Sequence, residues 1–179
     1  MLPGAIALKL SIGAPPTQVI RDTLGIAATV LAIVVVFSLI QVRRGRWSHI
    51  DASVKSERWE LNVLLFVVLL GAALVSGWLK QSQPLTIGLA TNAAMVALIL
   101  ALRHWFKISL HTSFAIFASS LLWPLWPSML FGAAFTIAIG WSRLVLGRHT
   151  LIETLLGGII GAIAGLVFIT LADQSIITH

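Results

Sequence analysis

Long apolar segments follow one another along most of this chain of 179 residues, and they constrain its fold more than any other feature. A helix that crosses a bilayer needs about 20 apolar residues, because irregular backbone is costly inside the hydrocarbon layer. The prolines of WPLWP, at 123–127, divide the longest apolar stretch into two helices. The sequence therefore predicts six spanning helices, at about 22–42, 60–79, 84–102, 110–123, 126–146 and 151–171.

Composition agrees with a membrane protein. Hydrophobic residues make up 58% of the chain and charged residues only 10%, whereas a soluble domain is about one quarter charged. We therefore expect an all-α integral membrane six-helix bundle of the cell (inner) membrane, in which residues 1–179 form a single transmembrane domain. The absence of cysteine excludes disulfides and cysteine-based metal sites. The net charge of +6 favours contact with anionic membrane lipids over contact with nucleic acid.

Most of the positive charge is predicted to lie on one face of the membrane. If the chain crosses six times, the segments 43–59, 103–111 and 142–153 all return to the same side. Excess Lys and Arg mark the cytoplasmic side, so this face is predicted to be cytoplasmic. Nine of the twelve basic residues belong to it: Arg43, Arg44, Arg46, Lys55, Arg58, Arg103, Lys107, Arg143 and Arg148.

The shared face also collects two histidines, His111 and His149, and few acidic residues. Guanidinium and ammonium groups bind phosphate oxygens, and an imidazole can attack phosphorus or donate a proton to a leaving oxygen. The sequence therefore predicts a phosphate-binding pocket at this interface. Ionisable residues so close to a membrane helix are candidates for function.

Spacing within the segment WSRLVLGRHTLIETLLGG, at 141–158, makes the prediction sharper. His149 and Glu153 are four residues apart, which places them on one face of a helix. A carboxylate that binds one ring nitrogen would leave the other nitrogen basic and oriented for chemistry. Arg143 precedes His149 by six residues, so a turn between them can bring both to one anion.

These residues also carry a family resemblance. The pattern Ser142–Arg143–x5–His149–x3–Glu153 resembles the third signature of the type 2 phosphatidic acid phosphatase superfamily, S-R-x5-H-x3-D. The segment Ile108–Thr112, ISLHT, is similar to its second signature, P-S-G-H. The first signature, K-x6-R-P, has its best match at Asp51–x6–Arg58–Trp59. The resemblance covers roughly residues 49–158.

The resemblance implies a metal-independent lipid phosphatase with no cofactor, and it assigns roles to seven residues. The catalytic residues would be His149 as the nucleophile that forms a phosphohistidine, Glu153 as its orienting carboxylate, and His111 as the general acid. Phosphate would be bound by Arg143 and Arg58, helped by Ser109 with its backbone amide, and Ser142 would lie in the pocket wall.

Four positions depart from the family pattern. Asp51 stands where the first signature has Lys, and we predict that Lys107 supplies the missing charge from the neighbouring loop. Glu153 is one methylene longer than the family's Asp. Ile108 and Leu110 replace Pro and Gly of the second signature.

Substrate and competing functions stay open at this stage. Phosphatidate, phosphatidylglycerophosphate, and polyprenyl phosphate or diphosphate all fit a pocket that reads phosphate, and a homo-oligomer is compatible with the sequence. The alternative is a non-enzymatic protein, either an anionic-lipid-binding module or a transporter, that uses the same basic pocket. Transporters often have internal repeats and polar groups near the bilayer midplane, whereas this sequence has no repeat and its charges gather at one interface. Haem held between His111 and His149 explains the surrounding Arg, Lys and Ser less well than phosphate does.

Overall fold

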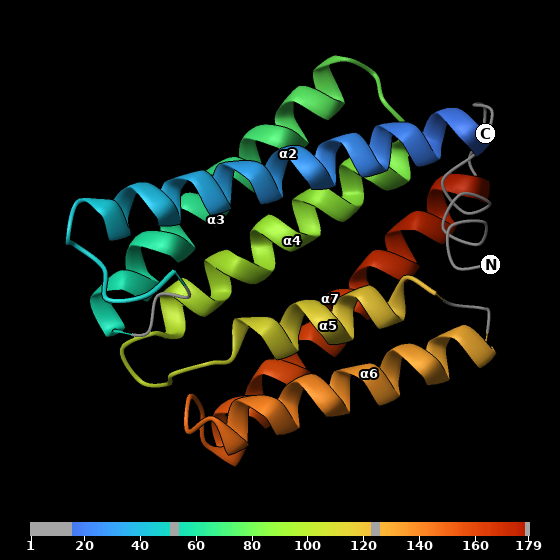
Figure 1. Cartoon of the computed structure of the whole chain (residues 1–179). Helices are drawn as coiled ribbons and strands as arrows, with labels where there is room; N and C mark the ends of the chain where they lie inside the picture. The colour runs from blue at the N-terminus through green and yellow to red at the C-terminus, as the bar shows by residue number, and fades with distance from the viewer. Residues whose placement is uncertain (1–15, 51–53, 123–125, 178–179) are drawn as a thin grey trace.

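The computed structural model describes residues 16–50, 54–122 and 126–177, and within these ranges the chain is helical without strands. Asp51 and the first three residues of WPLWP, 123–125, lie outside these ranges. The helices, labelled as in Figure 1, are α2 (Pro16–Arg43), α3 (Lys55–Trp78), α4 (Gln83–Leu102), α5 (Leu110–Ser120), α6 (Trp126–Val145) and α7 (Leu151–Ile177).

Five of these helices are long and apolar enough to cross a membrane: 24–43, 56–78, 83–102, 127–145 and 151–172. The exception is α5, which has 11 residues. At 1.5 Å per residue it is about 16 Å long, roughly half of the 30 Å hydrocarbon core. The all-helical membrane character is confirmed, and the six predicted helices appear as five long helices and one short helix.

Helix boundaries follow the prediction most closely where apolar sequence and helix coincide. Helix α4 begins one residue before the predicted 84–102 and α6 ends one residue before the predicted limit at 146. Helix α5 ends at Ser120, before the predicted limit at 123. Helices α2, α3 and α7 extend beyond their apolar segments, because polar residues continue a helix outside the hydrocarbon layer without raising its hydropathy.

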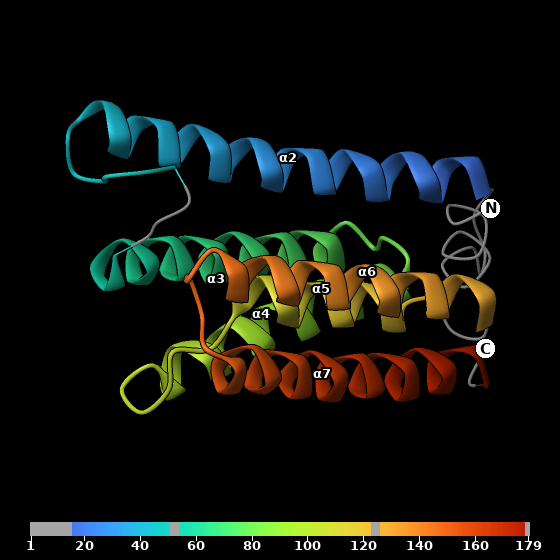
Figure 2. The same cartoon turned by 60° about the horizontal axis from the view of Figure 1, so that its bottom comes forward.

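The helices pack in a continuous sequence of neighbours. Helix α2 packs on α3, α3 on α4, α4 on α7, and α5 on both α7 and α6. In both views α2 lies along the outside of the bundle, next to α3 (Figure 1 and Figure 2). Larger apolar side chains of α4, α5 and α7 form one core cluster, which includes Met95, Phe117 and Phe168. This arrangement places α4, α5 and α7 at the centre of the fold.

Small residues allow α7 to approach α5 closely. A Cβ atom at Gly157 would overlap the backbone carbonyl oxygen of Ser109, the residue just before α5. A Cβ atom at Gly161 would overlap the backbone carbonyl oxygen of Ser113 in α5. Close packing through small residues is a common means of association between membrane helices. The contact fixes the start of α5 against the start of α7, which is where two of the three polar segments lie.

All three polar segments meet at one end of the bundle. Both views place the α2–α3, α4–α5 and α6–α7 connections at the same end (Figure 1 and Figure 2). The backbone amide of Ser109, just before α5, donates a hydrogen bond to the carbonyl oxygen of Glu153 in α7, at 3.1 Å. The prediction that these segments share one face of the bundle is confirmed.

Two glutamates of α3 fasten the α2–α3 connection to this end. Glu57 is 5% exposed and accepts hydrogen bonds from the Ser48 amide at 2.8 Å and the Val54 amide at 3.0 Å. Glu60 accepts hydrogen bonds from Gln41 Nε2 at 2.7 Å and Trp47 Nε1 at 3.1 Å. These contacts hold the first turns of α3 in place.

Candidate active site at the basic end of the bundle

The turn between α6 and α7 is a Schellman motif, and it explains the spacing between Arg143 and His149. Gly147 has a φ of +63°, which is the left-handed conformation that glycine adopts without strain. The amide of Arg148 donates to the carbonyl oxygen of Arg143 at 3.0 Å, and the amide of Gly147 donates to that of Leu144 at 3.0 Å. The amide of His149 also donates to the Arg143 carbonyl oxygen, at 3.3 Å. The six-residue separation therefore closes into a tight turn.

Helix α7 begins with a capping box made by Thr150 and Glu153. The amide of Glu153 donates to Thr150 Oγ1 at 3.3 Å, and the amide of Thr150 donates to Glu153 Oε2 at 3.1 Å. This reciprocal pair satisfies amides at the helix start that have no partner within the helix. Glu153 thus has a structural role in addition to any role in chemistry.

The same carboxylate binds the imidazole of His149. Nδ1 of His149 lies 3.0 Å from Oε2 of Glu153, and the two side chains are 8% and 18% exposed. A carboxylate accepts hydrogen bonds, so the pair favours the tautomer that carries its proton on Nδ1. Nε2 then holds the free lone pair. This is the arrangement predicted from the i, i+4 spacing.

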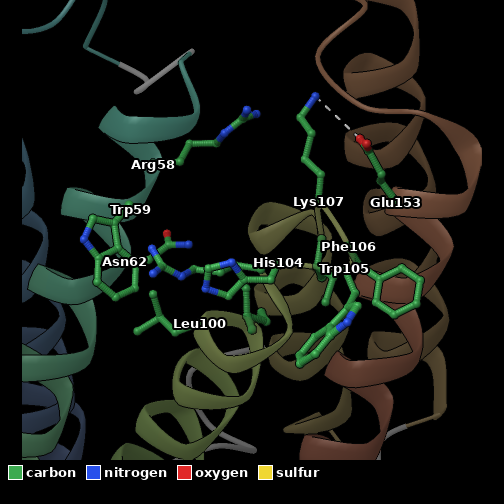
Figure 3. Close-up of a pocket in the computed structure, with 12 residues that line it drawn as sticks. Arg58, Trp59, Asn62, Leu100, His104, Trp105, Phe106, Lys107 and Glu153 are labelled. Atoms are coloured by element: carbon green, nitrogen blue, oxygen red, sulfur yellow. Dashed lines mark ion pairs between the residues drawn. The ribbon is translucent and has the colours of Figure 1, made fainter.

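Lys107 connects the α4–α5 segment to the start of α7. Its ammonium group donates to the carbonyl oxygen of Arg148 at 2.7 Å and lies 3.6 Å from Glu153 Oε2. Figure 3 shows the Lys107 and Glu153 side chains turned toward each other. Two segments separated by about 40 residues are therefore joined at the carboxylate that binds His149.

An open cavity of about 420 Å³ lies beside this group of residues. Three of the predicted site residues line it: Arg58, Lys107 and Glu153. They come from α3, the α4–α5 segment and α7, and Figure 3 shows Arg58 on the opposite side of the cavity from Glu153. The described lining residues carry three cationic side chains, Arg58, Arg103 and Lys107, and one carboxylate, Glu153. The cavity therefore favours an anionic ligand.

The remaining polar side chains of the cavity are not part of the predicted site. They are Asn62 from α3 and Arg103 and His104 from the turn after α4. The guanidinium carbon of Arg103 lies 3.5 Å from the centre of the Trp59 ring, which is a cation–π contact. The sequence placed these residues near the same interface, and it contained no spacing that joins α3 to the end of α4.

Burial lowers the pKa of the His149 imidazole below its ordinary value. The hydrogen bond to Glu153 opposes this shift, while the positive charges of Lys107 and Arg58 reinforce it. The ordinary histidine pKa is about 6.5, so His149 is neutral at pH 7. A neutral imidazole with a free Nε2 is the form that can act as a nucleophile or a base.

The other predicted site residues lie close to this end of the bundle but outside the cavity lining. Arg143 is partly buried, and its Nε atom has no hydrogen-bond partner among the described residues. Ser142 is exposed and bonds to the carbonyl oxygen of Ile139. Ser109 is fully buried, its hydroxyl pairs with Thr112 at 3.0 Å, and its amide is bonded to Glu153. The donors assigned to Ser109 and Ser142 are therefore engaged within the protein.

The predicted general acid, His111, lies in the first turn of α5 with an exposed side chain. It shares the basic end with His149, because Ser109, two residues earlier, is bonded to Glu153. The described residues that line the cavity do not include His111. The structure thus brings together His149, Glu153, Lys107 and Arg58, and leaves His111 at their periphery.

Within the described residues, no group of three or more His, Cys, Asp or Glu is placed to hold a metal ion. Comparison of the chain with family models, with curated proteins and with solved structures found no match.

Proposed function

We propose that this chain is a membrane-embedded phosphatase that hydrolyses a lipid phosphomonoester or pyrophosphate through a phosphohistidine. The single observation that carries the proposal is the 3.0 Å contact between His149 Nδ1 and Glu153 Oε2, beside a cavity with three cations. The pair supplies an oriented and neutral imidazole. The cationic side chains would bind the oxygens of the phosphate whose phosphorus the imidazole attacks.

In the proposed reaction, Nε2 of His149 attacks the phosphorus of the lipid phosphate. The bond from phosphorus to the lipid oxygen breaks, and the electron pair leaves with that oxygen, which takes up a proton. Water then attacks the phosphohistidine, which releases inorganic phosphate and restores the neutral imidazole. Glu153 stabilises the positive charge that forms on the ring during each transfer, as a carboxylate does for a histidine base in other hydrolases.

Lys107 and Arg58 support the proposal from opposite sides of the cavity. A phosphate bound between them would lie in the cavity that Glu153 also lines, and Glu153 is the partner of the His149 imidazole. Arg143 adds a buried Nε donor without a partner among the described residues. That donor would bind a phosphate oxygen. The carbonyl oxygen of Arg143 accepts a hydrogen bond from the His149 amide, which keeps the two residues close together.

The leaving lipid oxygen requires a proton, and we propose His111 as its donor. His111 is exposed at the start of α5, so a bound substrate that extends from the cavity toward α5 would contact it.

We further propose that the chain lies in the cell (inner) membrane and crosses it six times, with α5 as a short span. The basic end of the bundle would face the cytoplasm. The chain of the substrate would enter laterally between helices, with phosphatidate, phosphatidylglycerophosphate and polyprenyl phosphates as candidates.

One observation favours a second candidate, a protein that binds anionic lipids without chemistry. The capping box at Thr150 gives Glu153 a structural role, and a lipid-binding site needs the cavity cations but no nucleophile. The two candidates differ in the role of His149. A binding protein would tolerate its loss, and a phosphatase would not.

Phosphate release tests the proposal. Purified protein in detergent micelles is offered each candidate lipid, with and without a chelator, beside the His149→Ala variant and the matched control His49→Ala. His49 is an exposed histidine at the same end of the chain fold. The phosphatase proposal expects chelator-insensitive turnover that His49→Ala retains and His149→Ala loses. Turnover that is retained in His149→Ala would show that His149 is not the nucleophile.

A further inference from the structure

The charged cavity has two levels along α3. Arg58 and Asn62 are four residues apart, which corresponds to about 6 Å along the helix. Figure 3 shows Arg58 and Lys107 at the level of Glu153, with Asn62 and His104 further along α3 from its beginning. We call Arg58, Lys107 and Glu153 the outer level. The inner level consists of Asn62, Arg103 and His104.

The inner level contains a cation that is held in place and still has free donors. The Arg103 guanidinium lies over the Trp59 ring at 3.5 Å. Stacking uses the face of a guanidinium and leaves its N–H groups directed outward at the edge. Within the described ranges, Arg103 forms no hydrogen bond or ion pair with another side chain. Its donors are therefore available to a ligand in the cavity.

Apolar side chains of the same cavity lie beyond the inner level. Ile99 and Leu100 precede Arg103 by one turn of α4 and also line the cavity. From the end of the bundle inward, the order is the His149–Glu153 pair, then Arg103 with His104, then Ile99 and Leu100. A ligand would match this order if its reacting phosphate lay near the His149–Glu153 pair, a second anionic group lay near Arg103 and His104, and an apolar chain lay near Ile99 and Leu100.

We infer that the inner level binds a second phosphate group of the substrate, located between the reacting phosphate and the lipid chain. This inference rests on the proposed phosphatase function and narrows its substrates to lipids that carry two phosphates. The cavity has a volume of about 420 Å³ and is open at one side. That volume accommodates more than one phosphate group.

The chemistry of the first step is unchanged at the reacting phosphorus. Nε2 of His149 forms a bond to the terminal phosphorus while the bond from that phosphorus to the lipid-side oxygen breaks. With a polyprenyl diphosphate, the leaving group is the polyprenyl monophosphate, and Arg103 binds the negative charge that it gains. With phosphatidylglycerophosphate, the leaving group is phosphatidylglycerol, whose remaining phosphate stays bound at Arg103. Water then releases inorganic phosphate from His149.

Matched substrate pairs test the inference. Farnesyl diphosphate is compared with farnesyl monophosphate, and phosphatidylglycerophosphate with phosphatidate, in wild-type protein and in Arg103→Gln. A charge-assisted hydrogen bond contributes about 1.5–3 kcal/mol, so kcat/KM for the two-phosphate member should fall about 10-fold or more relative to its one-phosphate partner. The pair that shows the larger change identifies whether the two phosphates are adjacent or separated by glycerol. Arg44→Gln, at an exposed arginine of the same end, should leave both ratios unchanged.

Equal losses for both members of each pair, or no loss at all, would overturn the inference. His104→Ala serves as a second variant and should shift the ratios in the same direction. A binding measurement separates this result from the fate of the proposed function. His149→Ala should bind farnesyl diphosphate more tightly than farnesyl monophosphate, and Arg103→Gln in that background should remove the difference. Equal affinities would refute the second phosphate site even if no lipid is turned over.

Discussion

His149 Nδ1 and Glu153 Oε2 lie 3.0 Å apart, and the same oxygen accepts the amide of Thr150 at 3.1 Å. One carboxylate therefore both caps α7 and orients the imidazole. These two roles predict different results for different substitutions at the start of α7. They can be separated because glutamine also completes a capping box.

Glu153→Gln should retain the fold and lose most activity. The amide keeps the contact with Thr150 but carries no charge to stabilise a protonated ring, and loss of the equivalent charge in a serine protease lowers kcat by about 10⁴. We expect a fall in kcat of at least about 100-fold with little change in thermal unfolding. Thr150→Ala is the matched control, because it removes the cap, costs about 1 kcal/mol, and leaves the carboxylate. A large activity loss in Thr150→Ala alone would assign Glu153 to structure only.

The lowered pKa of His149 predicts how activity depends on pH. The neutral ring is the reactive form, so kcat/KM should rise with pH through a pKa below the ordinary histidine value of about 6.5 and then level off. The measurement is a profile of initial rates from pH 5 to 8 at low substrate concentration. A midpoint of this rise above about pH 6.5 would contradict the buried environment of His149.

The same shift predicts the effect of acid on stability. The folded state binds a proton at His149 less readily than the unfolded chain, because the folded pKa is lowered. The stability contribution is therefore complete above about pH 6.5 and declines as pH falls below that value toward the folded pKa. Thermal unfolding of wild type and His149→Ala between pH 5 and 8 measures it. The difference between the two proteins should change only below about pH 6.5.

Lys107→Ala should impair catalysis about as strongly as Arg143→Ala. Lys107 lies 3.6 Å from Glu153 Oε2 and lines the cavity, and loss of one donor to a transition-state oxygen typically costs about 100-fold or more in kcat. Steady-state kinetics on one lipid substrate compares the two variants. A rate in Lys107→Ala equal to wild type would rule out its predicted role as the replacement for the first-signature lysine.

Gly161→Ala should destabilise the contact between α5 and α7. The added Cβ would overlap the backbone of Ser113, and backbone cannot move as a flexible side chain does. Overpacking of this kind costs about 1–3 kcal/mol. Gly71→Ala in α3 is the control, because a Cβ there meets no atom within 4 Å. Thermal unfolding in detergent should show a lower midpoint for Gly161→Ala and an unchanged midpoint for Gly71→Ala.

Hydropathy predicted most of the helical architecture because each long helix carries its own apolar signal. It could not resolve α5, whose apolar sequence continues into WPLWP while the helix ends at Ser120. Hydropathy also missed the polar turns at the start of α3 and the end of α7, since these turns lie outside the apolar segments that the signal measures.

The candidate site was predictable where its residues lie on one local element. The pairing of His149 with Glu153 follows from the i, i+4 spacing, and it is present in the structure. The capping box T-x-x-E at 150–153 is a second local pattern of this kind, and the structure contains it. Arg103 and Trp59 were not predictable as a pair, because they come from α4 and α3 and meet only through helix packing.

The most direct test of the central claim is to trap the phosphoryl group on the protein. Purified protein is mixed briefly with a lipid phosphate that is radiolabelled in the terminal phosphate, quenched in alkali, and digested for peptide mapping. The account predicts acid-labile label on the peptide that contains His149, and no label in His149→Ala. Steady turnover without label on His149, or label that persists in His149→Ala, would contradict it.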